Sequence, residues 1–475
     1  MHPGRAGEIK TSGWECAFRS PGQGRKRGCA GDCRATPASG ISLSQVRANS
    51  ARSAHHELVK RKLLTLGLVI AGWAGGQTVT LEQAIQEALA NNLDLAAEKL
   101  NVTVAEARAI TARLRPNPVL TVSGQTLNVL GATYSPNTPL GPNQLNVHTD
   151  FPFERGHKRE ERIAVAKEER SLAELGVREV MRQVIANVQS GFVDVQQARD
   201  SLKLAQENLT SLEGVVTINQ VRVKSGDLAR VELDRSRVAA LQFRAAVQQA
   251  QLQLDQAKSQ LQQWMGRKTR AADFEVAGEL RRDGTVDSPA AIVRLAIARR
   301  PDYLADQQSQ ARSRADLRLQ LANGRVDYTI GTEFTHQSAW GVSGNSLGVY
   351  FSMPLRIFNK NQGEIARAQR EINLAGARSE ALEVSIQTEV EKAYRQYTVS
   401  KQLLTSVEAD MLVTARSVRD TTEYSYRRGE ASLVEFLDAQ RAFNDATQTF
   451  NEARGNYARS LYLLDTVSGA TISGN

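Results

Sequence analysis

The stretch LNVHTDFPFERGHK, residues 145–158, is matched 202 residues later by LGVYFSMPLRIFNK, residues 347–360. Both alternate apolar and polar residues before a charged segment with helical spacing, so each predicts a strand that leads into a helix. A second pair, VKSGDLARVELDRSRVA at 223–239 and YRRGEASLVEFLDAQRA at 426–442, sets a glycine between two helical segments. These matched pairs predict a tandem duplication.

Two further pairs complete the repeat. LEQAIQEALANNLDLAAE (81–98) corresponds to SPAAIVRLAIARRPDYLAD (288–306), and PVLTVSGQT (118–126) corresponds to VDYTIGTEF (326–334) at an offset of 208. Each half is expected to run short helix, helix, strand, loop, strand, long helix, glycine turn, long helix. The predicted repeats span residues 78–285 and 286–475.

The positive charge of the chain is concentrated in its first part. Residues 1–76 hold 12 Lys and Arg against 4 Asp and Glu, a difference of +8 out of the formal net charge of +9. Residues 77–475 are therefore close to neutral, which argues against a nucleic-acid partner. All three cysteines, Cys16, Cys29 and Cys33, also lie before residue 77, so the remainder has no thiol for a disulfide, a metal site or a nucleophile.

The segment VKRKLLTLGLVIAGWAGGQ (59–77) has a basic start, an apolar run and small residues, which predicts a secretory signal peptide. We interpret residues 1–58, rich in Gly, Arg, Ser and Pro, as an extension from a wrongly assigned start codon or as a disordered segment. No later segment approaches 18 consecutive apolar residues, so a mature chain that spans a membrane is expected to do so with strands.

Both long helical segments have apolar or small residues at alternating steps of three and four, which is typical of coiled-coil packing. These positions are Val188, Phe192, Val195, Leu202, Ala205, Leu209, Leu212 and Val216 in the first half, and Ile386, Val390, Ala393, Tyr397, Ser400, Leu404, Val407 and Met411 in the second. Because no proline interrupts residues 157–222, we expect a helical rod of ~100 Å there.

The predicted strands have one apolar and one polar face. In the second hairpin, Tyr328, Ile330, Thr332 and Phe334 alternate with Asp327, Thr329, Gly331 and Glu333. Such strands of about ten residues suit a membrane barrel around a wet lumen, although a half-buried soluble sheet has the same alternation. Because four strands cannot close a barrel and open edges do not occur in lipid, a membrane location requires the chain to oligomerise through its strands.

The order of these segments resembles that of the TolC-like outer membrane efflux proteins over residues 80–470. The supporting motifs are RPNPVLTV (115–122), FERGHKREERIAVAKEE (153–169), ARRPDY (298–303), MPLRIFNKNQGEIARAQ (353–369) and ARSLYLLDTVSG (458–469). The RGHKREERIA and IFNKNQGEIARA segments are most similar to the cobalt–zinc–cadmium resistance branch. The resemblance implies a mainly α fold with a membrane β-barrel.

It further implies a homotrimer in the Gram-negative outer membrane, with a twelve-stranded barrel in contact with outer membrane lipid and a twelve-helix tunnel that extends into the periplasm. The implied partners are a periplasmic adaptor (membrane fusion) protein and an inner-membrane proton-driven pump. The channel itself is passive, so the pump selects most of the substrate, and heavy-metal cations are one candidate class.

The resemblance also implies that the two helix–turn–helix tips close the periplasmic end and dock the adaptor. The implied docking residues are Gly226, Gly429, Tyr426, Arg427 and Arg428. Glycine permits the left-handed conformation that a tight reversal needs, as it would in a plain αα-hairpin. Val223 occupies the place of Tyr426 in the first copy, so docking at that tip is the weaker expectation.

Glu435 and Asp438, spaced i, i+3, share a helix face. The resemblance implies that they point into the narrow end of the tunnel, where the carboxylates of three copies would form a ring that favours cations and raises some pKa values. The alternative is that they are ordinary solvated acids near a helix N-terminus, where the helix dipole stabilises them.

Glu232 occupies the place of Glu435 in the first copy, and Arg235 occupies the place of Asp438. The Arg235 guanidinium could pair with an acid of a neighbouring protomer and hold the tunnel shut. Ala431 stands where relatives often carry a locking arginine, so Arg427 and Arg428 are candidate substitutes.

After residue 76 the only histidines are His148, His157 and His336, and their spacing matches no metal site. No catalytic motif is present, so we expect neither an enzyme nor a cofactor. The leading hypothesis is the exit duct of a tripartite efflux pump. The alternatives are the exit duct of a type I protein secretion system and a periplasmic structural or adaptor coiled-coil protein, which would have one helical hairpin and β-rich domains.

Overall fold

The computed structural model describes residues 77–127, 143–267, 274–282, 286–339 and 342–470. The description below concerns the unit Gly75–Asn475. The predicted extension 1–58 lies outside the described residues, as does the predicted signal peptide 59–77 apart from Gln77.

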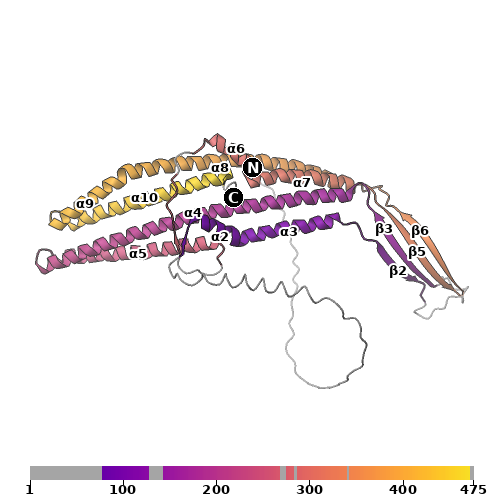
Figure 1. The fold of residues 1–475 in the computed structure, drawn as a ribbon, viewed down its shortest axis with the longest axis horizontal. Helices are drawn as coiled ribbons and strands as arrows, with labels where there is room; N and C mark the ends of the chain where they lie inside the picture. Colours follow the sequence, from indigo (N-terminus) through magenta and orange to yellow (C-terminus); the bar gives the residue numbers. More distant parts are fainter. Residues whose placement is uncertain (1–76, 128–142, 268–273, 283–285, 340–341, 471–475) are drawn as a thin grey trace, which may run out of the picture. The chain divides into compact units, whose positions relative to one another are not determined.

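The two halves have the same order of main elements (Figure 1). The first half contains β1 (Gln77–Val79), α2 (Leu81–Asn91), α3 (Leu93–Arg113), β2 (Val119–Gln125), β3 (Asn143–Phe153), α4 (Lys158–Lys224), α5 (Arg230–Trp264) and β4 (Phe274–Val276). The second contains α6 (Pro289–Arg299), α7 (Pro301–Asn323), β5 (Tyr328–Ala339), β6 (Val342–Ser352), α8 (Gln362–Ser406), the π-helix η1 (Val407–Met411), α9 (Leu412–Arg428) and α10 (Leu433–Ser468). The exact repeat boundary at residues 285 and 286 stays a prediction.

The long helices follow the predicted apolar seam up to one irregularity. Helix α4 runs for 67 residues, and of its predicted seam Val188, Phe192, Val195, Leu202 and Leu212 are buried. In the second half the seam is buried from Ile386 to Val407, but Met411 is exposed. The prediction for Met411 was wrong because η1 widens the helix for one turn and shifts the phase of the residues that follow. No helix in the described part of the chain is long and apolar enough to cross a membrane.

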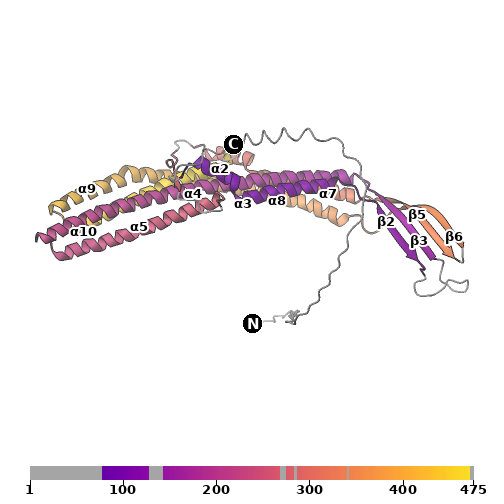
Figure 2. The same cartoon turned by 60° about the horizontal axis from the view of Figure 1, so that its bottom comes forward.

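The four longer strands form one antiparallel sheet in the order β2-β3-β5-β6. The sheet lies at one end of the helices, and the α4–α5 and α9–α10 reversals lie at the other (Figures 1 and 2). The register places Phe151 opposite Ile330 and Ile330 opposite Phe351, so apolar residues align across three strands. The intervening residues, among them His148, Glu333 and Gly348, form a polar face, as the alternation predicts.

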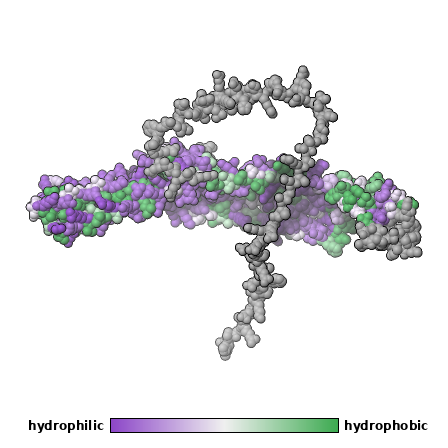
Figure 3. Space-filling model, turned by 90° about the horizontal axis from the view of Figure 1, so that it is seen from below, coloured by the Kyte–Doolittle hydropathy of each residue, from purple (hydrophilic) through white to green (hydrophobic). Residues whose placement is uncertain are grey.

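The apolar character of the sheet is visible on the molecular surface (Figure 3). Apolar residues are most exposed on the two edge strands, with Leu120 at 66% on β2 and Leu347 at 78% on β6, against 40% for Ile330 on β5. Within the described chain each edge strand has a neighbour on one side only, which explains the difference. Both edges therefore carry unpaired backbone groups and exposed apolar side chains.

Two short strands were missed by the sequence analysis. β1 pairs in parallel with β4, with Val79 opposite Val276, and both valines are buried together with Phe274. Strands of three residues are too short to show a period of two. They join the start of the first half to the segment after α5, and so extend the core around Val188 and Phe192.

Candidate functional site

The two helix reversals contain the predicted tip residues. At the first tip, α4 ends at Lys224 and Gly226 adopts a φ of 86°, in the left-handed region that favours glycine. The Gly226 N–H donates to the carbonyl of Val223 at 3.2 Å, and the Asp227 N–H donates to the carbonyl of Arg222 at 2.8 Å. These bonds satisfy the last carbonyls of α4, so the predicted conformational role of Gly226 is confirmed.

At the second tip the first helix, α9, also ends at a left-handed glycine, and the second helix, α10, begins with a stronger N-terminal cap. Gly429 has a φ of 86°, and the Glu430 N–H donates to the Ser425 carbonyl at 2.9 Å. Ser432 then caps α10: its Oγ accepts from the Glu435 N–H at 3.2 Å, and the Ser432 N–H donates to Glu435 Oε2 at 2.7 Å. This capping box fixes where α10 begins and holds the Glu435 carboxylate at the tip.

Tyr426 lies inside the tip and not on its surface. Its side chain is buried (3% exposed) and its ring stacks on Phe436 of α10, with centroids 5.5 Å apart and planes at 16°. Its hydroxyl donates to Asn219 Oδ1 of α4 at 2.7 Å. Burial raises the pKa of Tyr426 above its usual value and outweighs the opposing effect of the Asn219 hydrogen bond, so the hydroxyl remains a donor. In this conformation Tyr426 joins the two tips and is not available for direct contact with an adaptor.

A second buried polar contact joins the halves further from the tip. Gln440 Nε2 of α10 donates to Asn208 Oδ1 of α4 at 3.0 Å, and both side chains are buried. The sequence analysis did not select Asn208 or Asn219. Their signal was present, because asparagine recurs near the apolar seam of α4, where buried polar residues are used to set helix register.

The exposed surface of the second tip is aromatic and cationic. Arg428 places its guanidinium 4.3 Å from the ring centroid of Tyr424, which is 55% exposed. Arg427 pairs with Glu423 at 2.5 Å. Tyr424 was not predicted, yet it is the aromatic side chain that this tip presents to solvent. The docking role of these residues stays a prediction.

The predicted gate residues lie close to the reversals; Glu435, Asp438 and Arg235 are exposed, whereas Glu232 is half-buried. Hydrogen bonds from the backbone and side chain of Ser432 lower the pKa of Glu435, so this carboxylate is ionised at neutral pH. Asp438 lies one turn further along α10 and is 3.4 Å from Arg441. The predicted rise in pKa requires carboxylates from several copies and stays a prediction, whereas the capping role of Glu435 is present in one chain.

On the first tip Glu232 and Arg235 pair with each other. Arg235 Nη1 lies 2.8 Å from Glu232 Oε1, and the Arg235 side chain is mostly exposed. Such a pair contributes little to stability, so Arg235 can exchange its partner at low cost. No group of three or more His, Cys, Asp or Glu side chains within the described ranges could hold a metal ion.

Comparisons with known proteins agree with the fold described above. A family model described as "Outer membrane efflux protein" matches residues 84–267 and 292–470. The chain is 22% identical over 421 residues to Nodulation protein T of Rhizobium leguminosarum bv. trifolii, which covers 85% of this chain and 88% of that protein. It is also 24% identical over 392 residues to the cobalt-zinc-cadmium resistance protein CzcC of Cupriavidus metallidurans. That match covers 82% of this chain and 90% of that protein.

Solved structures share the fold. The Campylobacter jejuni CmeC outer membrane channel matches with a TM-score of 0.68 at 15% identity, over 82% of this chain and 85% of that chain. At this identity the match shows that the order and packing of the elements are those of an outer membrane channel.

Proposed function

Because the chain belongs to the outer membrane efflux protein family, whose members are outer membrane channels and not enzymes, we propose that it is the exit duct of a tripartite efflux pump. In this role it would pass substrate from a pump and adaptor complex to the exterior. The proposal is supported first by the sheet, which has one apolar face, one polar face and two open edges.

A sheet of this kind is complete only when its edges are paired. Lipid supplies no hydrogen bonds to the backbone, so β2 and β6 need strand partners in a membrane. The strands alternate in direction, so β6 of one copy and β2 of the next would meet antiparallel. We propose that three copies close a twelve-stranded barrel with the apolar face toward lipid and the polar face toward the lumen.

The helices would continue this barrel into the periplasm and end at the tips. The exposed Tyr424–Arg428 pair and Arg427 are the surface that we propose for docking a periplasmic adaptor, while the buried Tyr426 holds the two tips together. An inner-membrane proton-driven pump is the proposed third component. The similarity to a cobalt-zinc-cadmium resistance protein favours heavy-metal cations as cargo.

Conductance in a planar bilayer tests the duct. The purified protein is expected to form cation-preferring channels, because the lowered pKa of Glu435 keeps that carboxylate charged at neutral pH. The double variant Glu435→Gln, Asp438→Asn is expected to lower the cation-over-anion permeability ratio about threefold or more, since rings of like charge set ion preference. Reversal potentials in a salt gradient measure this ratio.

The glutamine variant retains the Ser432 capping box, since Gln can replace Glu there, so a change in selectivity would not come from loss of the helix cap. The matched control is Glu452→Gln, a carboxylate on α10 four turns or more away from the tip. A protein that remains a water-soluble monomer and never conducts across a lipid bilayer would rule out the duct.

Growth of a deletion strain tests the cargo. If heavy-metal cations pass through the duct, loss of the gene is expected to raise sensitivity to Zn, Co or Cd salts while leaving sensitivity to hydrophobic drugs unchanged. Growth inhibition on a series of metal salts, beside a panel of drugs, measures the difference. Sensitivity to drugs alone would contradict the metal assignment and leave the duct itself intact.

A further inference from the structure

A cavity of about 510 Å³ lies where the second hairpin meets the helices. The segment that joins α7 to β5 forms one wall, and the segment that joins β6 to α8 forms the other. Its charged lining residues are four cations and one acid, namely Lys158, Arg325, Arg356, Lys360 and Asp327. Lys158 and Asp327 lie 2.6 Å apart and neutralise each other. Three positive charges therefore remain around the cavity.

These three cations are exposed and lack acidic partners. Within the described residues, none of Arg325, Arg356 and Lys360 forms an ion pair. Arg356 Nη2 donates to the carbonyl of Lys360 at 3.3 Å, which holds its guanidinium near the start of α8. The alkyl chain of Arg325 packs so closely on Gly156 that a Cβ there would clash with it. Positioned cations without acids nearby make this a site for an anion.

The anion site has an apolar side as well. Leu355 and Phe358 line the same cavity and are 76% and 88% exposed. Ile357, which lies between them in the sequence, is 64% exposed. A free inorganic anion has no use for such a surface, whereas an amphiphile with an anionic head and apolar chains matches both parts.

Aromatic side chains show at which level of a membrane this cavity would lie. On the apolar face of the sheet, Phe153 stacks on Tyr328 with centroids 5.3 Å apart, and Phe351 lies 5.7 Å from Tyr328. These residues are at the ends of their strands nearest the helices. Membrane barrels carry such aromatic girdles at the boundary between apolar core and headgroups. The cavity follows directly on the helix side of this cluster, at the level of the headgroups.

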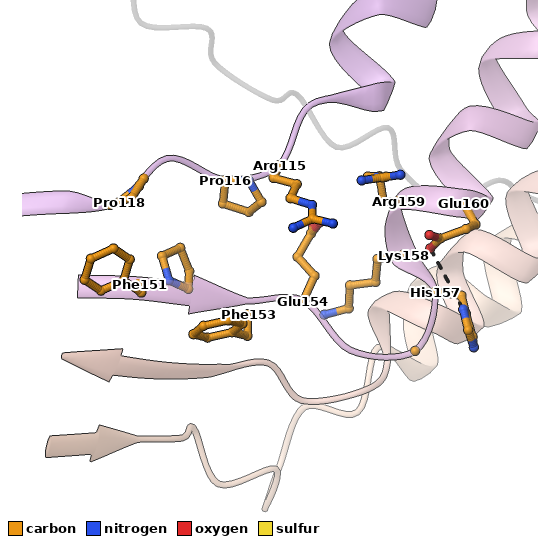
Figure 4. Close-up of a pocket in the computed structure, with 12 residues that line it drawn as sticks. Arg115, Pro116, Pro118, Phe151, Phe153, Glu154, His157, Lys158, Arg159 and Glu160 are labelled. Atoms are coloured by element: carbon orange, nitrogen blue, oxygen red, sulfur yellow. Dashed lines mark ion pairs between the residues drawn. The ribbon is translucent and has the colours of Figure 1, made fainter.

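The first half has a cavity of about 580 Å³ in the corresponding place, but its charges are mixed (Figure 4). Glu154 stands 202 residues before Arg356, and Asn117 stands 208 residues before Arg325, the offsets of the matched strand segments. The charged side chains of this lining are Arg115, Lys158, Arg159, Glu154 and Glu160. The duplicated fold thus explains why a cavity exists in both halves, whereas the excess of cations belongs to the second half.

We propose that the cavity of the second half binds the phosphate of an anionic phospholipid in the periplasmic leaflet of the outer membrane. Arg325, Arg356 and Lys360 hold the phosphate oxygens, which accept charge-assisted hydrogen bonds from guanidinium and ammonium groups. Leu355 and Phe358 contact the acyl chains. The bound lipid ties the junction of sheet and helices to the membrane surface. This site rests on the proposed function, since the cavity meets lipid only if the sheet lies in a membrane.

Native mass spectrometry of the full chain in detergent tests the site. The probes are phosphatidylglycerol and phosphatidylcholine with the same acyl chains, each added over a range of concentrations. Phosphatidylglycerol is expected to bind about tenfold more tightly, because basic side chains favour anionic lipids. In the triple variant Arg325→Gln, Arg356→Gln, Lys360→Gln this preference is expected to fall below about threefold. The matched control Arg115→Gln removes a cation from the cavity of the first half and is expected to leave the preference unchanged within about twofold.

A charge-conserving variant separates binding from folding. Arg325→Lys with Arg356→Lys is expected to keep most of the preference, and light scattering checks that every variant has the oligomeric state of the wild type. An equal loss in Arg115→Gln and the triple variant would overturn the site, as would displacement of the lipid by excess inorganic phosphate. A conducting protein that binds both lipids equally would overturn the lipid site and leave the duct standing. A water-soluble monomer that binds neither lipid would overturn both.

Discussion

Replacing Arg300 with methionine is expected to destabilise the second half of the chain by about 3 kcal/mol, in the range found when a buried ion pair loses one partner. Arg300 is 3% exposed and separates α6 from α7. Its guanidinium lies 2.6 Å from Asp302 and 2.6 Å from Glu389 of α8. Burial alone would lower the pKa of Arg300, but the hydrogen bonds and charges of these acids raise it overall.

Hydrogen exchange can detect this loss locally. Amides of α6 and α7 are expected to exchange about 100-fold faster in Arg300→Met, because 1.4 kcal/mol corresponds to a factor of ten. The matched control is Arg299→Ala at the adjacent, exposed arginine, which is expected to change stability by less than about 0.5 kcal/mol. Equal exchange in both variants would contradict a structural role for the Arg300 network.

The same network makes stability depend on pH. Burial alone would raise the pKa of Asp302, but the hydrogen bonds and charge of Arg300 lower it below its usual value. A group with a lowered folded pKa contributes stability that is fully present above its unfolded pKa, about 3.9 for Asp, and is lost as the pH falls through the folded value. The difference in melting temperature between the wild type and Arg300→Met is therefore expected to narrow below about pH 4. If the difference in melting temperature between the wild type and Arg300→Met stays constant from pH 7 to pH 3, the Asp302 carboxylate is not the cause of the pH dependence.

Truncation of Phe436 is expected to have a comparable effect at the tips. Phe436 is 0% exposed and packs on Tyr426 within a cluster that includes Leu212 and Val215 of α4. Phe436→Ala removes a large buried ring and leaves a cavity, at a cost of about 3–5 kcal/mol. Because the cluster joins the two tips, amides near Leu212 and Phe436 are expected to exchange about 100-fold faster or more, with little change in the sheet.

Val434→Ala is the matched control for this prediction. Val434 lies two residues away on the same helix and is 53% exposed, so its truncation removes little buried surface. It is expected to change exchange rates at the tip by less than about threefold, which corresponds to about 0.5 kcal/mol. A tip that is equally protected in Phe436→Ala and Val434→Ala would show that the ring stack does not hold the two reversals together.

The sequence was informative wherever the signal is local. Strand alternation, the three-and-four seam and the absence of proline in α4 each report the structure of neighbouring residues, so their elements were predicted with the right type and order. The reversals at Gly226 and Gly429 were predicted for the same reason, because a positive φ is a property of one residue. The π-helix was not predicted, and the phase shift that it causes leaves Met411 exposed.

The candidate site shows where local signals end. Tyr426 and the residues before Gly429 predict an aromatic and cationic tip, but the side-chain directions depend on α4, whose Asn219 lies 207 residues earlier in the chain. The tyrosine nearest the glycine is buried by that contact, and Tyr424 takes the exposed place. For Glu435 the sequence left two roles open, a carboxylate of the tunnel or an ordinary solvated acid near a helix N-terminus. Its bond to Ser432 shows a capping role in a single chain that the sequence analysis did not consider.

Periodicity and duplication were thus sufficient to establish a chain of two similar halves with long helices and two-faced strands, because each of these properties repeats within a few residues. The packing of distant segments decided which side chains reach the surface of the tips, how Arg300 is neutralised and which apolar groups remain uncovered at the sheet edges. Those outcomes depend on contacts between residues far apart in the chain, and no pattern within a single helix or strand contains that information.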